Sequence, residues 1–350
     1  MRIAQIAPLM ERVPPRLYGG TERIVSYLTE ALAGQGHAVT LFASGDSVTA
    51  ASLVACSGEA LRLDPAILDI VPHMSLMLEK VRQRADEFDV LHFHIDCVQM
   101  PLLRELGSRA VTTLHGRLDL PDLQPFYREF SDVPLVSISK AQRAPMPPVN
   151  WVGTVYHGLP AADYPPPGGA GEGYLAFLGR ISPEKRPDRA IEIARRAGMP
   201  LRIAAKVDKV DQAYFAEKIE PLIDGHQVRF IGEVDEAQRL DFLGKADALL
   251  FPIDWPEPFG LVMIEAMACG TPTIAFRCGS VPEVIDHGTS GFIVDDVDQA
   301  VDAVRRLPEL DRAAVRRRFD ARFTADRMAS DYLAIYERLT LGRVAPRRVA

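Results

Sequence analysis

The stretch "ALLFPIDWPEPFGLVMIEAMACGTPTIAF", residues 248–276, decides the fold. It starts with an apolar run at 248–252, passes through a proline-rich loop into an apolar helical segment that Gly270 ends, and closes with a second apolar run at 271–276. Strands that are apolar on both faces and are joined through a helix belong to a parallel sheet that helices cover on both sides. The stretch therefore predicts an α/β fold.

The same alternation of apolar and amphipathic runs extends around this stretch from residue 174 onward. Apolar runs predict strands, and amphipathic runs between them predict helices. The expected strands of this half are 174–179, 201–206, 228–232, 248–252, 271–276 and 291–295. The expected helices are 187–197, 212–223, 236–246 and the segment that Gly260 opens.

The first half repeats this plan without sharing sequence. Its expected strands are 2–8, 38–44, 88–94, 110–115 and 134–139, with a strand-like piece at 151–157. A helix is expected over 21–36, with Thr21 as its N-cap and Gly34 or Gly36 as its stop signal. Prolines and glycines concentrate in residues 143–173, which marks a boundary between the two halves.

These patterns divide the chain into four parts. We expect an N-terminal Rossmann-like domain at 1–155, a C-terminal Rossmann-like domain at 156–325, a closing helix at 326–340 that returns to the N-terminal domain, and a frayed tail at 341–350. A chain of 350 residues is longer than one hydrophobic core normally supports, so its length also predicts two domains.

The composition excludes several classes of protein. Hydrophobic residues make up 47% of the chain and charged residues 25%, which excludes general disorder. The net charge of −7 argues against a nucleic-acid partner, because binding to a phosphate backbone needs a clustered basic face. The four cysteines lack zinc-type spacing, and neither a signal peptide nor a transmembrane segment is indicated, so we expect a cytoplasmic protein with reduced thiols.

Two glutamates flank the start of the apolar helix in the opening stretch. Glu265 lies early in that helix among Val262 and Ile264, and Glu257 lies in the loop before it. Because burying an unpaired carboxylate costs several kcal/mol, each buried glutamate needs a partner. Ribose hydroxyls would be a partner for Glu265 and another polyol for Glu257, and the alternative for either residue is exposure or pairing with an arginine.

Basic residues follow the strand at 174–179. Ligands of open parallel sheets bind beyond the carboxyl ends of the strands, so this position is a candidate site. Arg180, Lys185 and Arg186 precede Pro187, which signals the start of a helix, and cations near a helix N-terminus bind anions. A solvated basic turn is the alternative interpretation.

Two adjacent glycines, Gly19 and Gly20, follow the first strand. They allow the backbone to approach a phosphate or a sugar closely, although a Gly-Gly pair can also form only a turn. No G-x-G-x-x-G motif stands there, which disfavours a nicotinamide-binding fold.

Histidines gather at the strand ends of the first half. His92, His94 and Asp96 alternate onto one face, His115 ends the next strand, and His157 follows the strand-like piece. A metal site built from His92, His94 and Asp96 is one interpretation. The favoured interpretation is that these histidines bind backbone or ligand, so we expect no metal.

Several of these segments together resemble the retaining glycosyltransferases of family 4. The resemblance is carried by "YGGTER" (18–23), "LGRISPEKR" (178–186), "VRFIGEV" (228–234) and "EPFGLVMIEAMACGTPTIAFRCGSVPEVIDHGTSGF" (257–292), and the last is similar to the E-x7-E block of the family. It implies the GT-B fold, in which two Rossmann-like parallel-sheet domains face each other across a cleft and the N-terminal domain meets the acceptor. A further likeness to a bacterial subgroup labelled glucosyltransferases implies UDP-glucose as the donor.

The resemblance also assigns roles to the matching residues. It implies that Arg180 and Lys185 bind the donor diphosphate, that Glu265 bonds the ribose hydroxyls, and that Glu257 contacts hydroxyls of the transferred sugar. The other implied contacts to the donor come from the backbone of Phe259, Gly260 and Leu261, from Gly232, Glu233 and Val234 at the nucleobase, from Gly19 and Gly20 at the phosphate or sugar, and from His115 at the sugar. The implied catalytic group is His115, Glu257, Arg180 and Lys185.

The implied reaction moves a hexose from a nucleoside diphosphate sugar to a hydroxyl acceptor, with retention of configuration and with no cofactor. A nucleotide-sugar epimerase of the same fold and a non-catalytic nucleotide-sugar-binding protein are the alternatives. The acceptor stays open between a small molecule, an oligosaccharide and a lipid-linked compound, and the last of these would bring the protein into peripheral contact with a membrane.

The chain departs from the family pattern at one position. Many relatives have a glycine-rich turn after the strand that corresponds to 201–206, where this chain has Lys206 and Lys209. We therefore expect the electrostatics on the donor side, or the choice of nucleobase, to differ from the common pattern.

Overall fold

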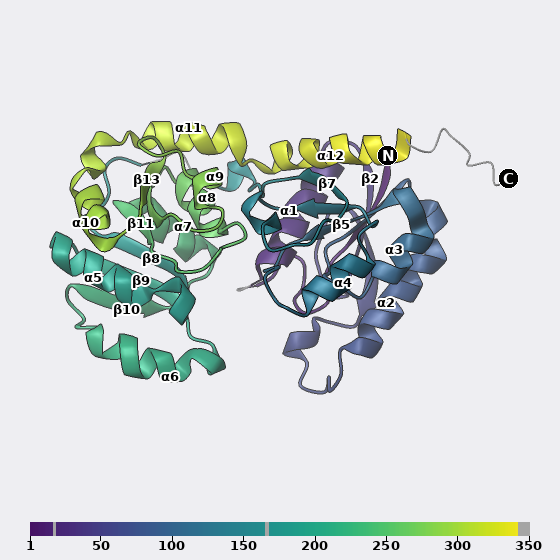
Figure 1. The fold of residues 1–350 in the computed structure, drawn as a ribbon, viewed down its shortest axis with the longest axis horizontal. Helices are drawn as coiled ribbons and strands as arrows, with labels where there is room; N and C mark the ends of the chain where they lie inside the picture. The colour runs from purple at the N-terminus through teal and green to yellow at the C-terminus, as the bar shows by residue number, and fades with distance from the viewer. Residues whose placement is uncertain (17–18, 165–167, 342–350) are drawn as a thin grey trace. The chain divides into compact units, whose positions relative to one another are not determined.

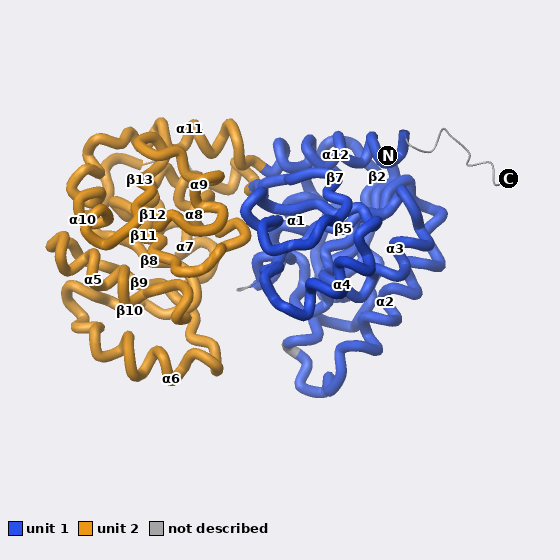
Figure 2. The backbone as a smooth tube through the Cα atoms, viewed as in Figure 1, with its two compact units in different colours: residues 1–158, 325–350 blue, residues 159–324 orange. Residues whose placement is uncertain are grey.

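The computed structural model describes residues 1–16, 19–164 and 168–341, and the chain forms two compact units (Figures 1 and 2). Unit 1 comprises Met1–Gly158 together with the C-terminal segment from Ala325, and unit 2 comprises Leu159–Thr324. The sequence patterns placed these two boundaries after residues 155 and 325. Apart from Leu341, the expected tail at 341–350 lies outside the described residues.

Unit 1 is built on a seven-stranded parallel sheet with the order β3-β2-β1-β4-β5-β6-β7. Its strands are β1 (Arg2–Ile6), β2 (Ala38–Ser44), β3 (Ser52–Ser57), β4 (Val90–Phe93), β5 (Ala110–Leu114), β6 (Leu135–Ser137) and β7 (Trp151–Thr154). Its α-helices are α1 (Gly20–Gly34), α2 (Val71–Arg84), α3 (Met100–Leu106), α4 (Leu123–Glu129) and α12 (Ala325–Leu341). The residues of β4 and β5 are all buried, as expected for central strands of a parallel sheet.

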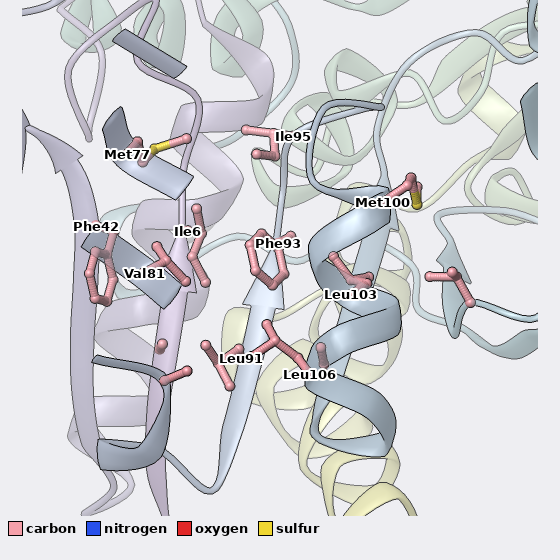
Figure 3. Packing of buried hydrophobic residues seen from close by; sticks show 14 of the residues in the cluster. Ile6, Phe42, Met77, Val81, Leu91, Phe93, Ile95, Met100, Leu103 and Leu106 are labelled. Atoms are coloured by element: carbon pink, nitrogen blue, oxygen red, sulfur yellow. The ribbon is translucent and has the colours of Figure 1, made fainter. Parts of the chain in front are cut away.

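The two faces of this sheet carry different kinds of side chain. On one face, shown in Figure 3, apolar side chains of the strands pack against helices α2 and α3. The side chains labelled there are Ile6, Phe42, Met77, Val81, Leu91, Phe93, Ile95, Met100, Leu103 and Leu106. Because successive side chains of a strand point to opposite faces, His92 of β4 and His94 directly after it lie on the other face, where α12 packs.

Unit 2 is built on a six-stranded parallel sheet with the order β10-β9-β8-β11-β12-β13. Its strands are β8 (Leu175–Arg180), β9 (Leu201–Lys206), β10 (Val228–Gly232), β11 (Ala248–Phe251), β12 (Thr273–Phe276) and β13 (Gly291–Val294). Its α-helices are α5 (Pro187–Ala197), α6 (Gln212–Tyr214), α7 (Glu236–Lys245), α8 (Leu261–Ala268), α9 (Val281–Val284), α10 (Val297–Arg305) and α11 (Arg312–Arg322). Its core packs apolar side chains of the sheet against those of α5 and α10.

Two local predictions are wrong. The N-cap of helix α1 is Gly19, with a φ of 153°, and not Thr21, because the helix begins at Gly20 and already includes Thr21. The helix expected over 212–223 breaks into α6, a π-helical turn at Phe215–Ile219 and a 3₁₀ turn at Glu220–Leu222. Pro221 lacks an N–H and its ring collides with the preceding turn, which accounts for the irregular end.

The predicted fold class, with two Rossmann-like parallel-sheet domains, is confirmed. In each sheet the strand order reverses once, between β1 and β4 in unit 1 and between β8 and β11 in unit 2. Open parallel sheets bind their ligands at the carboxyl ends of the strands beside such a reversal. Over the ranges that the structure describes, no helix is both long enough and apolar enough to span a bilayer.

Candidate functional site

The strand reversal of unit 2 brings two predicted segments together. Arg180 ends β8, and the 3₁₀ turn Pro183–Lys185 follows it. Glu257 lies in the loop between β11 and α8. Since β8 and β11 are neighbours and run parallel, both loops leave the same edge of the sheet.

Lys185 and Glu257 form an ion pair across this edge, between Nζ and Oε2. The same carboxylate oxygen accepts a hydrogen bond from Nε1 of Trp255 at 3.1 Å. The side chain of Glu257 is 11% exposed and that of Lys185 is 20% exposed, so the pair is largely withdrawn from solvent. Two residues that the sequence analysis assigned to one ligand are therefore direct neighbours.

The loop that carries Glu257 is held in place by the segment after β12. The N–H of Ser280 donates to the carbonyl oxygen of Glu257 at 3.0 Å, and the Ser280 hydroxyl donates to the carbonyl oxygen of Phe259 at 2.8 Å. Gly279 has a φ of +53°, and a Cβ atom there would lie 2.4 Å from both the N and the O of Glu257. Only glycine permits so close an approach, so this residue sets the position of the carboxylate.

Replacing Gly279 with alanine is expected to lower the free energy of unfolding by about 3 kcal/mol or more. The left-handed backbone costs an L-residue about 1–2 kcal/mol, and the overlap with Glu257 adds a further overpacking cost of about 1–3 kcal/mol. Gly288→Ala is the matched control, because Gly288 has a φ of +77° with no heavy atom within 4 Å of an added Cβ. Urea unfolding of both variants checks this, and equal losses in the two would contradict the role of Gly279.

Arg180 is surrounded by carboxylates. Its guanidinium bonds Glu184 at 2.6 Å and lies 3.7 Å from Asp208 and 3.9 Å from Asp211, and Asp208 also pairs with Lys206 at 3.0 Å. Desolvation raises the pKa of Asp211 above its ordinary value. The nearby charge of Arg180 lowers this pKa, whereas the charges of Glu184 and Asp208 raise it further. Lys206 thus belongs to a cluster of two cations and three acids at this edge, and its effect on the donor side stays a prediction.

Glu265 is buried in α8 and has an arginine partner. Its side chain is 5% exposed, and its Oε1 lies 3.4 Å from Nε of Arg239, whose side chain is 8% exposed. Arg239 also bonds Glu236 at 3.0 Å. The pairing with arginine that the sequence left open for Glu265 is therefore present, in a pair enclosed between α7 and α8.

Arg239 is the residue that the sequence analysis missed. It lies on the buried face of α7 with Phe242 and Leu243. The available signal was a cation at a position where the helical spacing predicts an apolar side chain.

The other residues assigned to the donor lie along the same edge of unit 2. Gly232 ends β10 with a φ of +79°, Glu233 after it is exposed, and Val234 is half-buried before the capping box of α7. Gly260 caps α8 with a φ of +78°, Leu261 is half-buried, and Phe259 is 2% exposed with its ring against Phe323. The Phe259 side chain thus belongs to the core, so a ligand contact of this residue would have to come from its backbone, whose carbonyl oxygen also accepts from Ser280.

In unit 1, the predicted residues stand at the ends of β1 and β5. Gly19 and Gly20 open α1, and His115 follows β5. The His115 ring stacks on His157 with the centroids 5.3 Å apart, and its Nε2 lies 2.9 Å from Nδ1 of His94. Of the described residues, no three His, Cys, Asp or Glu side chains are arranged to hold a metal ion.

A cavity of about 330 Å³ lies elsewhere in unit 1, beside the loop after β3. It is lined by Ser57, Gly58, Glu59, Leu61, Asp64, Ile67 and His73. None of the residues assigned from the sequence lines this cavity, so it is separate from the strand-end sites.

His115 is expected to stay neutral throughout the pH range 5–8. Burial lowers its pKa from the ordinary 6.5 to about 3, and the two groups facing it, His94 and His157, have lowered pKa values for the same reason. If the reaction needs neutral His115, its rate should therefore not fall as the pH is lowered through 6.5. Protonation of His115 should lower the rate only near pH 3. His115→Asn should lower kcat/KM without changing the shape of its pH profile. An apparent pKa of 6–7 that disappears in the variant would contradict this.

Two family models match the chain. Residues 18–145 match the model described as Glycosyltransferase Family 4, and residues 168–322 match the model described as Glycosyl transferases group 1. The first match falls in unit 1 and the second in unit 2, and together they span well over half of the chain.

Named relatives and a solved structure agree with these matches. A D-inositol 3-phosphate glycosyltransferase of Jonesia denitrificans is 31% identical over 47% of this chain, which spans only 42% of that relative. A glycogen synthase of Mycobacterium tuberculosis is 28% identical over 91% of this chain and 89% of its own length. The crystal structure of AviGT4, a glycosyltransferase involved in avilamycin A biosynthesis, has a TM-score of 0.76 and 25% identity and covers 98% of both chains.

Proposed function

Since the chain belongs to glycosyltransferase family 4, we propose that it moves a hexose from a nucleoside diphosphate sugar to a hydroxyl acceptor with retention of configuration. The observation that carries this proposal is the Lys185–Glu257 pair at the strand reversal of unit 2. A cation and a carboxylate in contact suit a ligand that has an anionic diphosphate next to a sugar rich in hydroxyl donors.

The diphosphate would lie against the cations of this edge. Lys185 and Arg180 stand before the N-terminus of α5, and Gly260 caps the N-terminus of α8. Backbone amides at helix N-termini and neighbouring cations both stabilise anions. In the structure Lys185 pairs with Glu257 and Arg180 with Glu184, so a bound diphosphate would compete with these carboxylates for the two cations.

The hydroxyl groups of the donor would lie against the two glutamates. Glu257, beside Lys185, would accept hydrogen bonds from hydroxyl groups of the transferred sugar. Glu265 would accept them from the hydroxyl groups of the ribose. A carboxylate has no donor, so both residues suit hydroxyl groups. Arg239 lies 3.4 Å from one oxygen of Glu265, so the ribose hydroxyls would share this carboxylate with the arginine. The backbone at Gly232–Val234 would meet the nucleobase.

The reaction that we propose proceeds on one face of the sugar. The bond between the anomeric carbon and the diphosphate oxygen breaks as the acceptor oxygen bonds that carbon from the same side. The proton of the acceptor passes to the departing diphosphate oxygen. Lys185 and Arg180 stabilise the negative charge that grows on this oxygen. Glu257 and Glu265 act on the hydroxyls of the donor, which differs from the paired carboxylates of a glycoside hydrolase.

UDP-glucose is the donor that we propose, on the subgroup resemblance of the segments 17–32, 113–123 and 177–194. The relatives of this chain include proteins named as a D-inositol 3-phosphate glycosyltransferase and a glycogen synthase. These names describe different acceptors, so the acceptor is best sought after the donor has been identified.

A thermal-shift panel of nucleoside diphosphates and their sugars tests this proposal. A ligand at 100 times its Kd stabilises the folded state by about 2.7 kcal/mol, which raises Tm measurably. We expect UDP and UDP-glucose to raise Tm above the other nucleotides, and the effect to shrink in Lys185→Ala. No shift with any nucleotide would refute the function. A second experiment separates the glycosyltransferase from the two alternatives by incubating the protein with the donor that binds, first alone and then with mixed acceptors. An epimerase would convert the donor without an acceptor. A non-catalytic binding protein would release no nucleoside diphosphate in either case.

A further inference from the structure

A continuous chain of buried hydrogen bonds runs through unit 1 from helix α12 to His115. We call it the relay, and its members are Gln5, His92, His94, Thr113, His115, Tyr332 and Tyr336. Except for His115 they are at most 2% exposed. Burying polar groups so completely costs free energy of folding unless each of them has a hydrogen-bond partner. Because each group here takes part in the bonds of its neighbours, the direction of one hydrogen bond constrains the direction of the next.

The relay has two arms that meet at Tyr336. In the first arm, His115 Nε2 lies 2.9 Å from His94 Nδ1, His94 Nε2 lies 2.6 Å from Gln5 Oε1, and Gln5 Nε2 donates to the Tyr336 hydroxyl at 3.2 Å. In the second arm, the Tyr336 hydroxyl lies 2.7 Å from His92 Nδ1. His92 Nε2 lies 2.7 Å from the Thr113 hydroxyl, which lies 2.9 Å from that of Tyr332.

The amide of Gln5 decides the direction of the first arm. Its oxygen faces His94 and only accepts, so His94 Nε2 carries the proton and donates. Neutral His94 then has a lone pair on Nδ1, and His115 must donate to it from Nε2. His115 is therefore the tautomer with the proton on Nε2 and a lone pair on Nδ1.

The second arm follows the same direction. Tyr336 accepts from Gln5 and donates its own proton to His92 Nδ1, and His92 Nε2 donates to Thr113. Thr113 in turn donates to Tyr332. Each of these six hydrogen bonds then has one donor and one acceptor, so the assignment is consistent over all seven residues.

The free end of the relay supports this direction independently. Nδ1 of His115 is buried and has no hydrogen-bond partner among the described residues. If the amide of Gln5 were reversed, every hydrogen bond would reverse and Nδ1 would carry an unpaired buried N–H. Unpaired buried N–H groups are rarer than unpaired acceptors, because leaving a donor unsatisfied costs more.

We propose that the relay holds His115 as the Nε2–H tautomer, so that its Nδ1 lone pair accepts a hydrogen bond from a hydroxyl group of the sugar substrate. Gln5, His94 and Tyr336 are then positioning residues for His115. The contact with the sugar rests on the proposed function, whereas the tautomer does not. A lone pair at this position attracts hydroxyl or amine donors and repels phosphate and carboxylate oxygens, so His115 would select the sugar part of the donor over its diphosphate.

Nitrogen-15 NMR of the histidine rings tests the tautomer directly, because protonated and unprotonated ring nitrogens have widely separated shifts. His115→Gln identifies the His115 signals by their loss. At pH 7.5 the wild-type protein should show an unprotonated Nδ1 and a protonated Nε2 at His115. The reverse pattern would overturn the inference, whatever the protein binds.

Two matched variants test the route. Tyr336→Phe removes the hydroxyl that orients the Gln5 amide and should shift His115 toward a mixture of tautomers. Tyr332→Phe removes an equally buried hydroxyl from the same helix at the far end of the second arm, and should leave His115 unchanged. An equal change in the two variants, or no change in Tyr336→Phe, would overturn the relay as the cause.

The link to the substrate has a separate readout. The affinity for UDP-glucose relative to UDP should fall about five- to tenfold in Tyr336→Phe, the equivalent of one net hydrogen bond, and should not change in Tyr332→Phe. An unchanged ratio in Tyr336→Phe with an altered tautomer would overturn the sugar contact. Failure of wild-type protein to bind any nucleotide sugar would refute the proposed function, while the NMR result would still decide the tautomer.

Discussion

Lys185→Ala is expected to lower kcat by about 10²-fold or more, because a positioned cation that stabilises the charge of the leaving group typically contributes that much. The loss should appear at saturating donor, since the developing charge on the diphosphate exceeds the charge of the ground state. Steady-state release of nucleoside diphosphate, with an acceptor found by the incubation described above, measures it. An unchanged kcat would remove Lys185 from this role.

Two further substitutions at Lys185 separate its charge from its contact with Glu257. Lys185→Gln keeps a hydrogen-bond donor for the carboxylate without the positive charge, and Lys185→Arg keeps the charge. If charge stabilisation matters, Gln should behave like Ala and Arg should retain more activity. Recovery of activity in the Gln variant would instead assign Lys185 to the orientation of Glu257.

Lys209→Ala is the matched control for these variants. Lys209 is an exposed lysine in the turn after β9, at the same edge of the sheet. Its removal changes the net charge of the unit as much as Lys185→Ala does, so it should change kcat less than twofold if local contact, not net charge, is responsible.

The central elements of both sheets could be predicted because both of their faces are buried. The strand predicted at 201–206 coincides with β9, and those predicted at 110–115 and 248–252 coincide with β5 and β11 to within one residue. Strand β3 and helix α2 left weaker signals and were not predicted. β3 is an edge strand with mostly exposed side chains, and Val71 and Leu76 of α2 are 60% and 58% exposed, so apolar spacing does not reveal which face is buried.

The candidate site of unit 2 could be predicted in part, because strand ends meet at one edge of a parallel sheet. That rule brings Lys185 and Glu257 together without any knowledge of side-chain geometry. It does not reveal which opposite charges pair with one another. The contact of Arg180 with Glu184 and that of Glu265 with Arg239 depend on rotamers and on the spacing between neighbouring elements.

The relay of unit 1 lay beyond prediction from sequence. Its members come from β1, β4, β5 and the last helix, and Gln5 and Tyr336 are 331 positions apart. The two tyrosines occupy apolar-type positions of α12, where they look like ordinary core residues. Only the packing of α12 on the histidine-bearing face of the sheet reveals that their hydroxyls complete a hydrogen-bond network.

Glu265→Gln is expected to abolish the ability of the protein to distinguish a nucleoside diphosphate from its 2′,3′-dideoxy analogue. Hydrogen bonds to a charged group contribute about 1.5–3 kcal/mol each, so wild-type protein should bind the ribonucleotide about 10²-fold more tightly. The variant should bind both nucleotides with the weaker affinity. Isothermal titration calorimetry of the two proteins with the two nucleotides gives four affinities. Together they form a thermodynamic cycle that isolates the interaction between Glu265 and the ribose hydroxyls.

The cycle matters because Glu265 also compensates a buried arginine. Removing one partner of a buried ion pair destabilises a protein by about 3–5 kcal/mol, so a loss of affinity alone would not separate ribose binding from damage to the fold. Glu236→Gln is the matched control: it removes the other carboxylate that bonds Arg239, and its side chain is 60% exposed. Glu236→Gln should keep the preference for the ribonucleotide and Glu265→Gln should lose it. If both variants kept the preference, Glu265 would serve only to hold Arg239, and the ribose would have to find its acceptors elsewhere along the edge of the sheet.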